Sequence, residues 1–129
     1  MVIAGLVLAG LAALVHVYIF YMESIAWTSE RARSTLGTGT VEQAMAQKEL
    51  AFNQGFYNLF LAIAVGLGIV IFAFGDTSVG ATLVFTGTGS MVAASLVLLL
   101  SSPEKASAAL KQGVIPALSV ITLAVGLAI

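Results

Sequence analysis

Residues 2–27 read VIAGLVLAGLAALVHVYIFYMESIAW, and Glu23 is the one carboxylate among them. A helix needs about 20 apolar residues to cross the hydrocarbon core of a bilayer, so this stretch predicts a membrane-spanning helix. Three further apolar windows cover about residues 50–74, 79–100 and 111–129. The sequence therefore predicts an all-α fold, a membrane four-helix bundle, in which residues 1–129 form a single integral membrane domain.

The composition indicates the same class of protein. Of the 129 residues, 60% are hydrophobic and 9% are charged, and the mean hydropathy is +1.08. A soluble domain carries about 25% charged residues, which argues against a soluble globular domain, a disordered chain and a nucleic-acid-binding protein. The chain has no cysteine and a single histidine. That argues against disulfides, iron–sulfur clusters, thiolate zinc sites and bis-histidine haem, so we expect no metal and no cofactor.

The first apolar stretch has no basic residue before it and continues through Phe20. A secretory signal has a basic start and a shorter apolar core, so we expect this stretch to be retained as the first helix.

The five cationic side chains fall on one side of the predicted bundle. They lie in or beside the first connection, about residues 28–49, and the third connection, about residues 101–110. They are Arg31, Arg33, Lys48, Lys105 and Lys111. The second connection, residues 75–78, has no cation. Cytoplasmic loops carry an excess of lysine and arginine. We therefore expect the first and third connections in the cytoplasm and both termini outside.

Two local patterns predict helix starts in the connections. Thr40-Val41-Glu42-Gln43 matches a capping box, so the second helix is predicted to begin near Val41. A helix over residues 41–74 would be roughly 51 Å long, and its first turns should protrude from the bilayer or bend. Ser102-Pro103 combines a preferred N-cap with proline at the first helical position. It predicts a short cytoplasmic helix or an early start of the fourth helix.

Small residues at four-residue spacing predict close packing between helices. The stripes are Gly5, Ala9 and Ala13; Ala62 with Gly66; Ala64 with Gly68; and Thr82, Thr86, Ser90 and Ala94. They fit the interior of a compact four-helix bundle. One stripe could alternatively be the seam of a homodimer.

Polar residues within membrane spans are costly and are therefore candidates for function. The candidates on the first, second and fourth helices are His16, Tyr18, Glu23, Trp27, Glu49, Asn53, Gln54, Tyr57, Asn58, Gln112 and Pro116. Helical spacing places His16, Glu23 and Trp27 on one face of the first helix. Pro116 cannot donate a backbone hydrogen bond, which leaves the carbonyl of Gln112 free.

On the second helix the polar residues form two neighbouring stripes. One stripe is Glu49, Asn53 and Tyr57, and the other is Gln54 and Asn58. Together with the polar groups of the first and fourth helices, they lie in the half of the membrane nearest the cations. The sequence therefore predicts a polar pocket in the inner leaflet, walled by the first, second and fourth helices and open to the cytosol.

Each candidate also has a structural interpretation. His16 could bond a backbone carbonyl, and Glu23 and Glu49 could be headgroup-level residues. Tyr18 and Trp27 could belong to an interfacial aromatic belt. Gln54 and Asn58 could form hydrogen bonds between helices.

Three motifs resemble those of a known family. They are residues 16–23 (HVYIFYME) with Trp27-Thr28, residues 53–58 (NQGFYN), and residues 112–117 (QGVIPA). Together they resemble the small four-helix bacterial membrane family catalogued as domain of unknown function thirteen-hundred-and-four. The resemblance implies a four-helix membrane fold and a location in the bacterial cytoplasmic (inner) membrane, and it carries no activity with it.

The sequence supports three functional hypotheses. The first is a small membrane protein that binds or transports a small amphipathic or cationic solute, with proton coupling at Glu23, Glu49 or His16. The second is an acid–base enzyme, isomerase-like, that acts on a lipid-like substrate. The third is an accessory subunit of a larger membrane complex. The expected partners are the lipid bilayer, a small-molecule ligand, and a second copy or a larger complex.

Single-cysteine variants test the predicted topology, because the chain has no cysteine of its own. Thr77→Cys should react with a membrane-impermeant maleimide added to spheroplasts. Ser34→Cys should react only after the membrane is permeabilised. Labelling of Ser34→Cys in intact spheroplasts would contradict the expected orientation.

Overall fold

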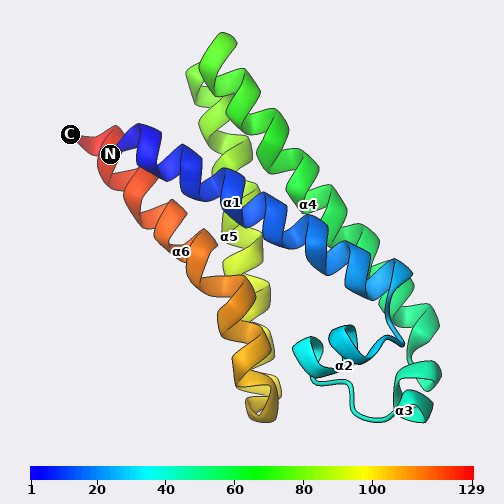
Figure 1. Cartoon of the computed structure of the whole chain (residues 1–129). Helices are drawn as coiled ribbons and strands as arrows, with labels where there is room; N and C mark the ends of the chain where they lie inside the picture. Colours follow the sequence, from blue (N-terminus) through cyan, green and yellow to red (C-terminus); the bar gives the residue numbers. More distant parts are fainter.

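The structure, a computed structural model, describes all 129 residues (Figure 1). It is all-α and contains α1 (Val2–Phe20), η1 (Tyr21–Ile25), α2 (Glu30–Leu36), α3 (Val41–Ala46), α4 (Lys48–Phe74), α5 (Thr77–Ser101), η2 (Pro103–Lys105) and α6 (Ala106–Ala128). The segment η1 is a π-helical continuation of α1, and η2 is a 3₁₀ turn that leads into α6.

Four helices are long and apolar enough to cross a membrane, as predicted. Their bounds, with η1 and η2 included, are Val2–Ile25, Lys48–Phe74, Thr77–Ser101 and Pro103–Ala128. The fourth begins earlier than the predicted residue 111, in agreement with the Ser102-Pro103 start signal. The chain is therefore a small multi-pass membrane protein whose outer surface contacts lipid.

The four long helices form a ring in the order α1, α4, α5, α6. Each packs against its two neighbours in this order, whereas α1 and α5 barely touch. Both termini lie at one end of the bundle, and α2 and α3 lie at the other (Figure 1). The short helices therefore cover the end that holds all five cationic side chains.

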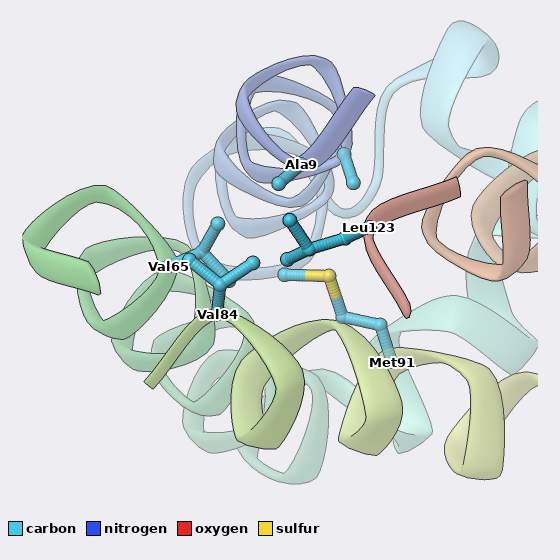
Figure 2. Close-up of a cluster of buried hydrophobic side chains, with 6 residues drawn as sticks. Ala9, Val65, Val84, Met91 and Leu123 are labelled. Carbon is cyan, nitrogen blue, oxygen red and sulfur yellow. The ribbon is translucent and has the colours of Figure 1, made fainter. Parts of the chain in front are cut away.

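All four long helices contribute to one buried hydrophobic cluster (Figure 2). Its members are Ala9 and Ala12 of α1, Val65 of α4, Val84 and Met91 of α5, and Leu123 of α6. Lipid is as apolar as these side chains, so the cluster stabilises the bundle through close packing rather than through burial from water.

Small residues set the distance between neighbouring helices at several crossings. At the crossing of α1 and α6, a Cβ atom added to Gly5 would lie 2.7 Å from the backbone nitrogen of Leu123. The Ser119 hydroxyl donates to the Gly5 carbonyl oxygen at 2.9 Å across the same crossing. Helices α1 and α6 are thus in direct backbone contact near the termini.

Two of the predicted stripes pack differently from expectation. Gly66 has open space around it, although its partner Ala62 is buried. All four residues of the third-helix stripe, Thr82, Thr86, Ser90 and Ala94, are exposed rather than buried between helices. Helix α5 packs instead through another face, which includes Gly80, Gly87 and Met91.

The connections carry the predicted helix starts. Thr40 and Gln43 form the capping box, with hydrogen bonds of 3.2 Å and 2.9 Å between side chains and backbone. The helix that begins there breaks at Gln47, so α3 is separated from α4. This break confirms the expectation that residues 41–74 protrude or bend.

Substitution of Gly5 should destabilise the bundle far more than substitution of Gly66. Gly5→Ala forces a methyl group against the backbone of α6, and such overpacking costs about 1–3 kcal/mol. Gly66→Ala adds a methyl group in open space and should be neutral or stabilising, because alanine favours helices. Thermal unfolding in detergent measures both variants. Equal stability of the two variants would contradict the backbone contact between α1 and α6.

Candidate functional site

A cavity of about 310 Å³ lies at the end of the bundle that carries the cations. Its polar lining residues are Glu23, Trp27, Thr38, Gln47, Gln54, Asn58, Lys105 and Gln112. Its apolar lining residues are Leu36, Leu50, Ala51, Ala94, Leu98 and Ala108. Five candidates selected from the sequence therefore share one space: Glu23, Trp27, Gln54, Asn58 and Gln112.

Glu23 is the only acidic residue on this cavity. Its Oε2 accepts a hydrogen bond of 2.7 Å from Nδ2 of Asn58, which also donates to the backbone oxygen of Gln54 at 3.2 Å. The carboxyl group is thus held by a neutral amide from α4. A carboxyl group within a membrane span that has a neutral partner and faces a cavity is a functional candidate on physical grounds.

The π-helical segment η1 brings Glu23 to the α4 side of the first span. The adjacent Ser24 donates from Oγ to the backbone oxygen of Phe52 at 2.8 Å. Gly55 makes this approach possible, because a Cβ atom there would collide with Ser24 and lie 3.1 Å from Cβ of Glu23. Single π-helical turns often occur at functional sites.

Trp27 joins η1 to the segment that covers the cavity. Its indole Nε1 donates to the backbone oxygen of Ala44 in α3 at 2.6 Å, and its side chain is buried. It packs with Ala44 and Ala51, next to Leu36 of α2. Trp27 therefore holds the first connection against the bundle through its buried ring and its hydrogen bond.

The first connection is ordered by its own hydrogen bonds. Arg33 donates to the backbone oxygens of Thr28 and Gly39 at 3.3 Å and 3.0 Å. The left-handed Gly37 ends α2, and its amide donates to the carbonyl of Arg33. Sequence reasoning missed α2, although Ser29 and Gly37 are typical start and stop signals for a short helix.

Three polar residues of the cavity were also missed: Thr38, Gln47 and Lys105. All three lie in or next to a connection, where polar side chains are expected and therefore do not indicate a functional site. Thr38 is 9% exposed, and its Oγ1 has no hydrogen-bond partner. A buried hydroxyl without a partner is uncommon and leaves a hydrogen-bonding group unused on the cavity wall.

Several predicted site residues lie outside this cavity. His16 is buried, and its Nδ1 bonds the backbone oxygen of Ala12 at 2.9 Å. Pro116 is buried inside α6. Tyr18 is 42% exposed and lines a second, smaller cavity. The expectation that His16 and Glu23 share one pocket is therefore wrong.

The two polar stripes of α4 separate in the structure. Glu49, Asn53 and Tyr57 are exposed on its outer face, with Tyr57 68% exposed. Asn53 donates to the Glu49 carbonyl of its own helix at 3.2 Å. The expectation that both stripes face one pocket is corrected, since only Gln54 and Asn58 line the cavity.

The walls of the cavity also differ from expectation. Helix α5, the third span, was not predicted to line the pocket, but it contributes Ala94 and Leu98. The first connection contributes Leu36, Thr38 and Gln47. The cavity is thus lined partly by the first connection as well as by the long helices.

The family model "Protein of unknown function (DUF1304)" matches residues 10–124 of the chain. The chain belongs to the DUF1304 family. The match confirms the resemblance that the three motifs indicated, and it includes every residue that lines the cavity of this DUF1304 protein. Searches of curated proteins and of solved structures gave no significant match.

Trp27→Phe should loosen the segment that covers the cavity. The phenyl ring keeps most of the packing but removes the indole donor, so the Ala44 carbonyl keeps only its hydrogen bond from the Gln47 amide. The loss of one hydrogen bond costs about 1 kcal/mol, which corresponds to roughly fivefold more frequent opening. Hydrogen exchange of residues 38–47 measures this opening. Tyr57→Phe on the outer face of α4 is the matched control, and equal exchange in both variants would contradict the role of Trp27.

Proposed function

We propose that this protein binds and transports a small amphipathic or cationic solute through the cavity that Glu23 lines, with coupling to protons. The observation that carries the proposal is the Glu23 carboxyl group, which sits within a membrane span and faces a 310 Å³ cavity with the neutral amide of Asn58 as its partner.

The chemistry of the walls supports an amphipathic ligand. Half of the lining residues are hydrophobic when the Trp27 ring is counted among them, and they come from α4, α5, α6 and the first connection. Three glutamines and Asn58 supply hydrogen-bond donors and acceptors, and the unpartnered Thr38 hydroxyl adds another. Small-molecule sites commonly combine apolar walls with a few placed polar groups, and their volumes begin at about 300 Å³.

Proton coupling follows from the position of the carboxyl group. A carboxylate away from water is costly and is stabilised by neutralisation, either through a bound proton or through a bound cation. The two states exclude each other, so entry of a cationic solute releases a proton and departure of the solute allows a proton to return. Glu23 is the residue that would carry this exchange.

The arrangement favours transport over an acid–base enzyme. The enzyme hypothesis requires His16 and a carboxylate at one substrate. His16 bonds its own helix and does not line the cavity, and Glu49 lies on the outer face of α4. Glu23 is then the single proton-transfer group of the proposed set that faces the cavity.

A second candidate function is that of a subunit in a membrane assembly. The outward polar stripe of Glu49, Asn53 and Tyr57 supports it, because polar groups on a lipid-facing surface are typical of contacts between membrane helices. The partner would be a second copy of the chain or another membrane protein. Transport by the purified chain alone would remove the need for a different protein.

The orientation belongs to the same proposal. We infer that the end bearing the five cations faces the cytosol of a bacterial inner membrane, because lysine and arginine accumulate on cytoplasmic segments. The cavity would then open toward the cytosol, and the solute would be taken from that side.

Currents on a solid-supported membrane test the proposal, with phenyltrimethylammonium as the probe cation. Proteoliposomes of the purified chain should give a transport current on addition of the probe, and the current should depend on an imposed pH gradient. Glu23→Gln should remove the current, since loss of a charge-assisted contact of about 2 kcal/mol weakens binding roughly 30-fold.

Glu49→Gln is the matched control, because it removes the same charge from the exposed face of α4. It should transport as the unmodified chain does. If Glu23→Gln is folded and keeps its current, or if both variants lose it equally, the proposal is wrong.

A further inference from the structure

A second cavity, of about 240 Å³, lies between α1, α6 and α2. Its apolar wall comes from Val15, Ile19, Met22, Leu36 and Ala108. The remaining lining residues are Tyr18, Thr35, Lys111 and Gln112. Lys111 is the single charged residue on this cavity, and no carboxylate lines it.

The position of this cavity gives it access to the surface of the bundle. Val15 and Met22 mark its extent along the first span, which is about 10 Å of helix. Tyr18 is 42% exposed, and Lys111 is also exposed. The cavity is therefore an apolar slot that reaches the outer surface, with an ammonium group at the end of the span where α6 begins.

We propose that this slot binds an anionic glycerophospholipid, with an acyl chain along the apolar wall and the headgroup phosphate at Lys111. The chemistry is complementary at both ends. The wall from Val15 to Met22 matches a hydrocarbon chain, and Lys111 with the Thr35 hydroxyl supplies a charge and a donor for phosphate oxygens.

Basic pockets between membrane helices at the bilayer surface recognise lipid headgroups in this way. Two occupants fit less well. A soluble anion would leave the apolar wall empty, and a zwitterionic lipid would bring a second cation near Lys111. Leu36, Ala108 and Gln112 border both cavities, but Lys111 lines only this slot and Glu23 only the other, so variants of these two residues test the two proposals separately.

Native mass spectrometry of the full chain in detergent tests the site. Phosphatidylglycerol should bind more tightly than phosphatidylcholine with the same acyl chains. Lys111→Gln should weaken phosphatidylglycerol about fivefold, as expected for one lysine at an anionic headgroup. Lys111→Arg should restore binding. The matched control, Lys48→Gln, removes the same charge at a residue that lines neither cavity.

The acyl-chain wall has its own pair of variants. Val15→Trp fills the slot and should reduce binding of phosphatidylglycerol, whereas Val17→Trp places the same side chain on an exposed position outside it. The proposal is overturned if the Lys111 and Lys48 variants bind the lipid equally. It is also overturned if phosphatidylcholine binds as tightly as phosphatidylglycerol, or if inorganic phosphate displaces the lipid.

Discussion

At the end of the bundle that carries both termini, α1 lies directly against the backbone of α6, because Gly5 has no side chain to keep Leu123 away. Gly126 allows the same approach at Val2, and Ser119, one turn further from the C-terminus than Leu123, donates to the Gly5 carbonyl. From there the two helices diverge toward the other end, where α2 lies (Figure 1). Both cavities lie at this second end. The divergence of α1 and α6 from their close crossing at the termini therefore leaves room for the cavities at the opposite end.

Much of the fold could be predicted from the sequence because its signals are local. Four apolar stretches of membrane length, the capping box at Thr40 and the Ser102-Pro103 start all appear in the structure. Helix α2 escaped prediction because its seven residues carry no apolar periodicity long enough to detect. The order of the helices around the ring could not be predicted either, because it depends on which pairs of helices pack closely against each other.

The π-helical turn of η1 explains why His16 and Glu23 do not lie on one face of the first helix, as the sequence predicted. The expectation extended a regular helix of 3.6 residues per turn through Trp27. A π turn inserts extra residues, so every side chain after Phe20 is rotated relative to those before it. His16 consequently faces the bundle core, while Glu23 faces Asn58 of α4. No residue pattern in residues 21–25 announces such a turn, so spacing alone could not place Glu23.

The separation of the two polar stripes on α4 has a different cause. In water the apolar face of a helix marks its buried side, but in a bilayer both the lipid-facing and the protein-facing sides are apolar. Polarity therefore could not tell which stripe points inward. Residue size does indicate the inward side. Ala51, Gly55 and Ala62 are all buried and lie on the face that meets other elements of the bundle. Asn58 follows the same spacing and reaches the cavity with Gln54, whereas the stripe that begins at Glu49 is rotated away to the outer surface. In a membrane helix of this kind, the small residues indicate which of the polar residues can form a site within the bundle.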